Sequence, residues 1–251
     1  MTIKKMLKKL TPVPLLEGYR RIQRQREKDR NATRTTEEVF TEIYAANKWA
    51  PGSNSFDSGV GSTDQRIMAA YVGAVQNWLS RISSAKLTIV DLGCGDFRIG
   101  RQLVDFCARY IGIDIVKPLI DYNEQHFGSP NVEFLHLNMI EDPLPEADVC
   151  FLRQVLQHLS NDQIQTVLRR VEKYRWTVIT EHHPSNANLT RANVDKPHGA
   201  DIRLFDRSGV FLDQPPFNVS RQRLNLLLEL EGHAFSGWHD PGVIRTYVLT
   251  P

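Results

Sequence analysis

The sequence predicts an α/β fold built around a mostly parallel β-sheet, and three observations lead to this prediction. Short apolar segments of strand length alternate with segments of helical periodicity between residues 86 and 180. The helical segments are long enough to serve as crossovers between parallel strands. Near the C-terminus, Asp240-Pro241-Gly242 is a turn signal between two apolar segments and predicts a terminal β-hairpin. We therefore expect a seven-stranded sheet with helices on both faces.

Each strand is predicted by a short apolar run between polar or turn-forming residues. The runs cover residues 86–91, 110–115, 132–137, 148–152, 175–180, 233–238 and 243–249. Periodic apolar residues predict helices over 98–109, over 116–127, from Ser160 onward, and from Ser220 to Gly232.

The segment before the first strand is predicted to form a helical cap. Thr35 with Glu38, and Ser62 with Gln65, have the spacing of capping boxes, which begin helices. A stretch rich in glycine and serine ends at Ser62 and resembles a flexible flap.

The chain is accordingly expected to have three parts. They are a basic arm (1–34), a helical cap with its flap (35–85), and an α/β domain (86–251). Within the last part, residues 181–219 form an unusually long connection with apolar anchors, so we expect a folded lid there.

The composition is typical of a globular protein, with 41% hydrophobic and 24% charged residues. No apolar run reaches the roughly 18 residues that span a bilayer. The three cysteines are too scattered to indicate a disulfide framework or a zinc site. The basic start is not followed by a secretory apolar core, so we expect a cytoplasmic protein.

The formal net charge of +2 is unevenly distributed along the chain. Residues 1–35 carry eleven Lys or Arg and three Asp or Glu, and residues 3–10 place apolar side chains at helical spacing beside four lysines. Such an arm could lie on the anionic inner face of a membrane, contact nucleic acid, or remain a solvated terminus. The sequence leaves these alternatives open and favours nucleic acid least.

The most informative motif is Val90-Asp91-Leu92-Gly93-Cys94-Gly95-Asp96-Phe97-Arg98. A buried strand runs into a glycine-rich turn, where Gly93 permits the turn and Gly95 lets the backbone approach a ligand. Free N–H groups at the start of the following helix are expected to face that ligand. Asp114 ends the next strand, where a carboxylate can accept both hydroxyls of a ribose. Arg98 occupies the position where a dinucleotide site has a small residue, so NAD is disfavoured.

At these residues the chain resembles the class I S-adenosylmethionine-dependent methyltransferases, whose fold is Rossmann-like. The resemblance covers roughly residues 86–180 by motif. It implies S-adenosylmethionine as cofactor and S-adenosylhomocysteine as product. The cofactor residues implied by the resemblance and by the strand ends are Asp91, Gly93, Cys94, Gly95, Asp114, Ile115, Asn138, Met139 and Arg153. Asn138 stands where the family often has an acid near the adenine, and His158 is expected to be structural.

A second resemblance concerns Phe40 to Ser62. Ile43-Tyr44, Trp49 and Ser58-Gly59-Val60-Gly61-Ser62 look like a lead-in of bacterial methyltransferases associated with cell-surface polysaccharide biosynthesis. The flap tip would then deliver backbone N–H groups to the carboxylate of the cofactor. A surface loop without such a role is the alternative.

Polar residues after the fourth and fifth strands are candidates for the substrate chemistry. Methyl transfer requires a nucleophile held in line, and a hydroxyl nucleophile benefits from a general base. The candidate catalytic residues are His182, His183, His198 and Asp201, the last as a group that orients a histidine. If the strand continues through the two adjacent histidines, at most one of them faces the substrate. The candidate substrate-binding residues are Gln154, Glu181, Lys196 and Arg203.

Lys196 and Arg203 would suit an anionic substrate such as a phosphorylated sugar, or they could belong to a solvated loop. Glu181, His183, His198 and Asp201 could instead gather a divalent metal, although their spacing has no recognised metal signature.

The sequence therefore predicts methyl transfer from S-adenosylmethionine to a sugar, glycan or other small hydroxylated acceptor. Its basic start and flap favour a membrane-proximal glycan. Two rivals stay open: an RNA methyltransferase that uses the basic arm, and a non-catalytic partner that only binds the cofactor. The acidic body and the lack of interleaved aromatic and basic residues argue against RNA.

Overall fold

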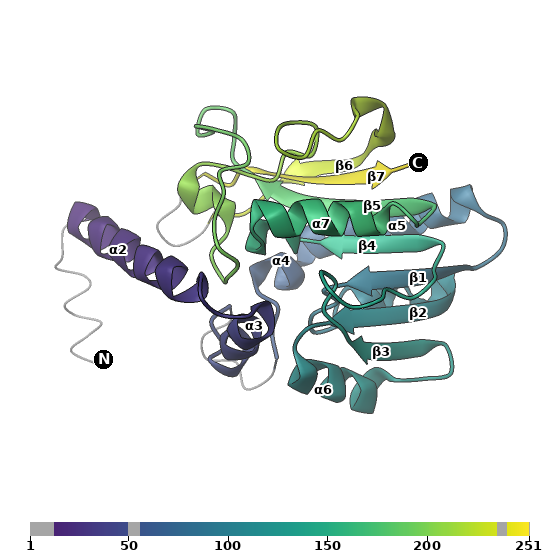
Figure 1. The fold of residues 1–251 in the computed structure, drawn as a ribbon. Coiled ribbons are helices and arrows are strands. Elements are labelled where there is room, and N and C mark those ends of the chain that lie inside the picture. The colour runs from purple at the N-terminus through teal and green to yellow at the C-terminus, as the bar shows by residue number, and fades with distance from the viewer. Residues whose placement is uncertain (1–12, 50–55, 235–239, 251) are drawn as a thin grey trace.

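The structure is a computed structural model that describes residues 13–49, 56–234 and 240–250. It confirms the predicted α/β fold, with one seven-stranded sheet of order β3-β2-β1-β4-β5-β7-β6 (Figure 1). Strands β1 to β5 pair in parallel, and β7 pairs antiparallel with β5 and β6. The strands are β1 (Leu87–Leu92), β2 (Cys107–Asp114), β3 (Val132–His136), β4 (Val149–Arg153), β5 (Trp176–His183), β6 (Leu224–Glu231) and β7 (Val243–Leu249).

Helices cover both faces of the sheet. The described helices are α2 (Val13–Asn31), α3 (Thr36–Ala45), α4 (Val60–Thr63), α5 (Gln65–Ile82), α6 (Lys117–Phe127) and α7 (Asn161–Val171). On one face, Val75 of α5 packs in a buried cluster with Ile89 and Phe151. On the other, Val167 of α7 packs with Val90 and the anchors of the lid. The alternation of strand side chains between these two clusters follows from the two-residue period of a strand.

Of the two predicted starts of the cap helices, one is confirmed and one is wrong. Thr35 and Glu38 form the expected capping box of α3. The cap of α5 is not Ser62 but Asp64, whose carboxylate accepts the N–H groups of Arg66 and Ile67. Ser62 is buried within the short helix α4. An acidic residue at this position also matches the helix dipole, so Asp64 suits the role.

The predicted helix over 98–109 is wrong. Two short 3-10 turns (Gly100–Gln102 and Val104–Phe106) fill this segment, and β2 begins at Cys107. Phe97 has a φ of 59°, a left-handed conformation that interrupts a right-handed helix where it would begin. This turn buries the Phe97 ring, whose centroid lies 4.8 Å from that of Phe134.

The leucine-rich segment from Ser220 to Gly232 is also not a helix. It contains β6, which pairs with β7 along the edge of the sheet, so the terminal hairpin is built from this segment. Pairing with an existing strand outweighs the helix preference of leucine, because intrinsic propensity is a weak influence beside tertiary contacts. The predicted strand 233–238 lies largely outside the described residues.

Helix α2 projects from the body of the protein and contacts the lid at its C-terminal half (Figure 1). Lys28 lies 2.7 Å from Asp206, and Asn31 donates a hydrogen bond to the backbone oxygen of His198. The amphipathic start of the predicted arm, residues 3–10, lies outside the described residues. Within the described ranges, no helix has the length and apolar character needed to cross a bilayer.

Candidate active site

The carboxyl ends of β1, β2 and β4 open into one cavity of about 380 Å³, on the side of the sheet edge where α3 and α4 lie (Figure 1). Ligands of open α/β sheets gather at this edge. All nine residues predicted for the cofactor line the cavity: Asp91, Gly93, Cys94, Gly95, Asp114, Ile115, Asn138, Met139 and Arg153. Four segments that are separate in the chain, at residues 91–95, 114–115, 138–139 and 153, thus meet at this cavity.

The glycine turn after β1 is held in a left-handed conformation. Gly93 and Gly95 have φ values of 80° and 57°, which other residues adopt only with strain. The N–H groups of Gly93 and Cys94 both donate to the carbonyl oxygen of Ile113, which ties the turn to β2. A side chain at Gly93 would also meet Val155, because a Cβ there would lie 2.6 Å from a valine methyl group.

The expectation of free N–H groups at a helix start is wrong at this turn. An α-helix does not follow it, and the next two amides are already engaged. Gly95 N–H donates to Asp114, and Asp96 N–H donates to the hydroxyl of Ser58. The turn therefore brings the backbone of Gly93 and Gly95 to the cavity wall and does not present a helix N-terminus there.

Asp114 is a buried carboxylate held by backbone donors. It accepts hydrogen bonds from the N–H groups of Gly95, at 3.2 Å, and Val116, at 3.1 Å. Burial raises the pKa of Asp114 to about 6, and these hydrogen bonds oppose the rise. The carboxylate is thus fixed in place on the cavity wall and is charged at neutral pH.

Asp91 and Arg153 bring two opposite charges to the inner end of the cavity. Asp91 accepts a hydrogen bond of 2.5 Å from the hydroxyl of Tyr110. Burial raises the pKa of Asp91 to about 6, while this hydrogen bond and the nearby Arg153 lower it. The Arg153 guanidinium lies over the Tyr71 ring, 5.0 Å from its centroid, and donates to the carbonyl oxygen of Gly61 in the flap.

The described part of the flap packs directly on the glycine turn. The Ser58 hydroxyl lies 3.0 Å from the hydroxyl of Tyr44, and the Ser58 N–H donates to Asp96. Gly61 lies against Gln154, because a Cβ at Gly61 would be 1.8 Å from the amide oxygen of that side chain. The flap therefore closes one side of the cavity. Residues 50–55 of the predicted flap lie outside the described residues.

The two adjacent histidines point in opposite directions, as the sequence predicted for a continuing strand. Strand β5 includes both. His182 lines the cavity, and its Nε2 lies 2.6 Å from the carbonyl oxygen of Pro241. His183 faces away and packs against Phe211, with ring centroids 4.8 Å apart. Burial lowers the pKa of His182 to about 4 and that of His183 to about 3.

Of the remaining catalytic candidates, Asp201 lines the cavity and His198 does not. The Nδ1 atom of His198 lies 3.3 Å from the amide nitrogen of Gln163, beside the start of α7. The predicted pairing of Asp201 with a histidine is thus not seen. Among the described residues, the acidic and imidazole side chains form no cluster that could hold a metal ion.

Three of the four predicted substrate residues belong to the protein interior. Gln154 lines the cavity, whereas Glu181, Lys196 and Arg203 do not. Glu181 accepts hydrogen bonds from the N–H groups of the two residues after Val155, and burial raises the pKa of Glu181 to about 8. Arg203 is 1% exposed and donates to the carbonyl oxygen of Leu159. Lys196 is 4% exposed, and burial lowers the pKa of its amine to about 7.

An aromatic wall completes the cavity, and the sequence analysis largely missed it. Rings from α3, the following loop and the lid line part of the cavity: Phe40, Tyr44, Trp49 and Phe205. His158 lies between two of them, with its ring centroid 5.2 Å from that of Trp49. Burial lowers the pKa of His158 to about 3, and its Nδ1 contacts the carbonyl oxygen of Gly199, which fits the expected structural role. Phe205 has no signal in the sequence that would have predicted this position.

Comparisons with known proteins find similarity in one segment of the sequence and in the fold. Residues 89–174 match the family model of a methyltransferase domain. No curated protein matches the chain significantly. The fold is similar to that of the N-methyltransferase NodS from Bradyrhizobium japonicum in complex with S-adenosylhomocysteine, with a TM-score of 0.55, 14% identity, and coverage of 86% of this chain and 98% of that chain.

Two further solved structures share the fold. Magnesium protoporphyrin IX methyltransferase from Synechocystis, with bound S-adenosylmethionine, has a TM-score of 0.53, 14% identity, and coverage of 87% of this chain and 98% of that chain. The 1,6-didemethyltoxoflavin-N1-methyltransferase from Burkholderia thailandensis has a TM-score of 0.53, 16% identity, and coverage of 84% and 86%. At these identities the likeness shows the fold.

Proposed function

We propose that the protein transfers the methyl group of S-adenosylmethionine to a small hydroxylated acceptor, sugars and glycans included, and releases S-adenosylhomocysteine. The observation that carries this proposal is the convergence of all nine predicted cofactor residues on one cavity. The matched methyltransferase segment and the shared fold support the same cofactor class.

The lining of the cavity fits the chemistry of this cofactor. Asp114 offers a fixed carboxylate to the ribose hydroxyls, and the glycine turn with Gly93 and Gly95 forms part of the cavity wall beside it. The cofactor has an amino-acid tail with one positive and one negative group, and Asp91 and Arg153 offer the complementary charges. Met139 offers an apolar contact for the adenine ring, and Asn138 offers an amide.

S-adenosylmethionine supplies an electrophilic methyl group on a sulfonium sulfur. The acceptor oxygen forms the new C–O bond as the C–S bond breaks, and its proton must leave to a base or to water. His182 and Asp201 are the two predicted catalytic residues on the cavity wall, and we propose one of them as that base. Burial and the nearby Glu27 raise the pKa of Asp201, which brings it closer to the range that suits proton transfer at neutral pH.

The experiment that tests the cofactor is calorimetric titration of the whole protein with S-adenosylmethionine, S-adenosylhomocysteine and NAD. Binding of the first two without NAD supports the proposal. Binding of NAD alone contradicts it, because it would indicate hydride chemistry.

The acceptor is tested next by transfer of a labelled methyl group to nucleotide sugars and to glycolipid extracts. Asp201→Asn and His182→Gln, compared by their pH profiles of kcat, identify the base. Label in RNA alone would favour the RNA methyltransferase. The predicted peripheral location on a membrane rests on residues 1–34, and co-sedimentation of the whole chain with anionic vesicles tests it.

A further inference from the structure

A second hollow runs along helix α2 and adjoins the candidate active site. We call it the α2 groove. Three of its lining residues, Lys48, Asp201 and Phe205, also line the cavity. Its other lining residues come from α2 and α3: Tyr19, Arg20, Gln23, Arg24, Arg26, Glu27, Arg30 and Glu42. A ligand in the cavity can therefore extend into the α2 groove across this shared boundary.

The acidic side chains of α2 and α3 in the groove already have partners. Lys48 lies 2.7 Å from Glu27 and 3.3 Å from Glu42, and Arg30 lies 2.9 Å from Glu42. The hydrogen bond from Arg34, more than the one from Lys48, lowers the pKa of Glu42 to about 2, so it stays ionised. The positive charges of Lys48 and Arg30 are therefore already paired with carboxylates of the protein.

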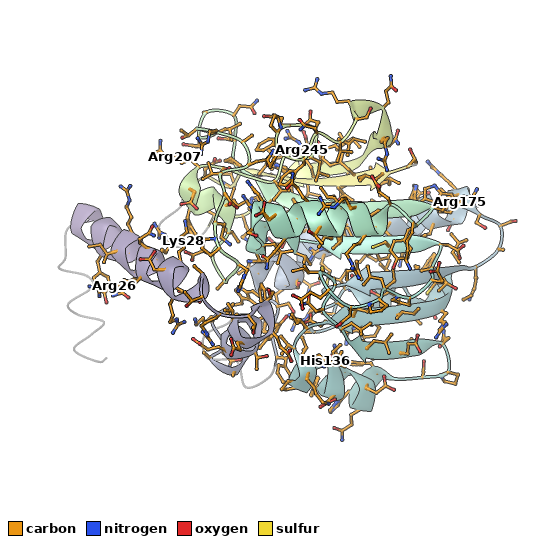
Figure 2. The ribbon with its side chains drawn as sticks, viewed as in Figure 1. Arg26, Lys28, His136, Arg175, Arg207 and Arg245 are labelled. Atoms are coloured by element: carbon orange, nitrogen blue, oxygen red, sulfur yellow. The ribbon has the colours of Figure 1, made fainter. Side chains whose placement is uncertain are left out.

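The groove has further positive charge on the arginines nearer the start of α2. Arg20, Arg24 and Arg26 line it, and Figure 2 labels Arg26 on this helix. Within the described ranges, neither Arg24 nor Arg26 forms an ion pair. The Arg24 guanidinium lies 4.9 Å from the centroid of the Phe205 ring, at the boundary with the cavity. A single guanidinium group can bind two oxygens of one phosphate through two parallel hydrogen bonds.

Asp201 places a carboxylate at the boundary between the cavity and the α2 groove, whereas Arg20, Arg24 and Arg26 line the groove itself. One of its carboxylate oxygens is buried and has no hydrogen-bond partner among the described residues. A buried polar atom without a partner is costly, so a ligand that donates a hydrogen bond there would stabilise the site. A hydroxyl group can make this contact, whereas a phosphate would be repelled by the carboxylate.

We propose that the acceptor is a phosphate-bearing compound with a hydroxylated portion. The hydroxylated portion enters the cavity past Asp201, and the phosphate lies in the α2 groove against Arg20, Arg24 and Arg26. This inference rests on the proposed methyl transfer. It moves anion recognition from Lys196 and Arg203, which are buried in the protein, to helix α2.

The test uses inorganic pyrophosphate as the probe and the full chain as the protein. Calorimetry at low salt compares the wild type with the triple variant Arg20→Gln, Arg24→Gln, Arg26→Gln. The control is the triple variant Arg81→Gln, Arg101→Gln, Arg169→Gln, which loses the same charge away from the groove. S-adenosylhomocysteine is titrated into each protein as a separate readout.

We expect the α2 variant to bind pyrophosphate about tenfold more weakly than the wild type, since three contacts at solvent-accessible arginines contribute about 1.4 kcal/mol together. The control variant keeps wild-type affinity, and all three proteins bind S-adenosylhomocysteine equally.

Absence of pyrophosphate binding to the wild type, or equal loss in both variants, overturns the anionic acceptor site. Binding of phosphatidylglycerol vesicles or an RNA oligonucleotide without pyrophosphate binding also overturns it and assigns the groove to a membrane or to RNA. Absence of S-adenosylhomocysteine binding to the wild type refutes the proposed methyl transfer. Failure of the proposed function and failure of the anionic acceptor site are therefore distinguishable. A sugar phosphate and a lipid-linked phosphate acceptor share this chemistry, and competition of each against pyrophosphate separates them.

Discussion

Replacing Asp114 by alanine should weaken binding of the cofactor while the fold is retained. The structure gives this carboxylate two backbone partners, the N–H groups of Gly95 and Val116, and a place on the cavity wall. A carboxylate that accepts two ribose hydroxyls makes charge-assisted hydrogen bonds, which contribute about 1.5–3 kcal/mol. Loss of one such bond corresponds to a roughly 10- to 150-fold weaker affinity for S-adenosylhomocysteine, and loss of both to a larger weakening.

The stability of the Asp114→Ala variant is set by two opposing effects. Two backbone N–H groups lose their acceptor, at a cost of about 1–3 kcal/mol each where water cannot replace it. Burial raises the pKa of Asp114 from 3.8 to about 6 despite these hydrogen bonds, so the ionised carboxylate carries a desolvation penalty in the native state at neutral pH, and alanine removes this penalty. The effects largely cancel, so we expect the free energy of unfolding to change by only about 1–2 kcal/mol.

The assay is calorimetric titration with S-adenosylhomocysteine, together with urea unfolding of the same preparations. Asp148→Ala is the matched control, because Asp148 accepts the N–H of Thr88 at the other end of β1, 2.8 Å away. It should lose stability and keep its affinity for the cofactor. Unchanged affinity of Asp114→Ala, or equal weakening in both variants, would refute the ribose assignment.

Three further predictions concern the glycine turn, the titration of Asp114 and the buried Arg203. Gly95→Ala places a Cβ 2.4 Å from the hydroxyl oxygen of the flap serine at a φ of 57°, so urea unfolding should show a loss of about 1–2 kcal/mol and calorimetry a weaker cofactor affinity; Gly73→Ala, with open space around it on α5, should be neutral or stabilising. Affinity for S-adenosylhomocysteine should fall as the pH drops through about 6, where Asp114 becomes protonated. The free energy of unfolding of the wild type, measured relative to Asp114→Ala so that the contributions of the buried histidines cancel, should rise as the pH drops through the same range, because the pKa of Asp114 is higher in the folded state and that state binds the proton more tightly; titrations and urea curves between about pH 5 and pH 8 check both signs. Arg203→Met leaves the carbonyl oxygen of Leu159 without its buried donor, so thermal unfolding should show a loss of about 2–4 kcal/mol, and an unchanged melting temperature would contradict the structural role.

The cofactor side of the cavity was predictable because its determinants are local. Gly93 and Gly95 directly follow a strand, and Asp114 ends the next one, so the topology of a parallel sheet brings them to one edge. The orientation of His182 and His183 was predictable for the same reason, since neighbours in a strand face opposite sides. Each of these predictions needed only a strand and its period.

The errors concern segments whose structure depends on distant partners. The segment around β6 has the composition of a helix, but β7 offers it a strand to pair with, and Leu226 remains 55% exposed at the edge. The segment after Phe97 has helical periodicity, but burying that ring against β2 and β3 requires a tight turn. Neither partner can be recognised within the local window that sets periodicity.

The lid shows why polar residues near a site are ambiguous in a sequence. After the end of β5, the lid contains one short 3-10 helix (Arg203–Asp206) among its described elements, so many of its N–H and C=O groups have no partner in a strand or helix, and those that are buried must be satisfied in other ways, such as by side chains. Asn193 does this within the lid: it accepts from the N–H of Phe211 and donates to its carbonyl oxygen and to that of Pro215. Arg203 serves the backbone in the same way. The lid thus uses polar side chains to support its own fold, and Asp201, one of whose oxygens has no partner among the described residues, is the lid side chain best placed to act on a ligand.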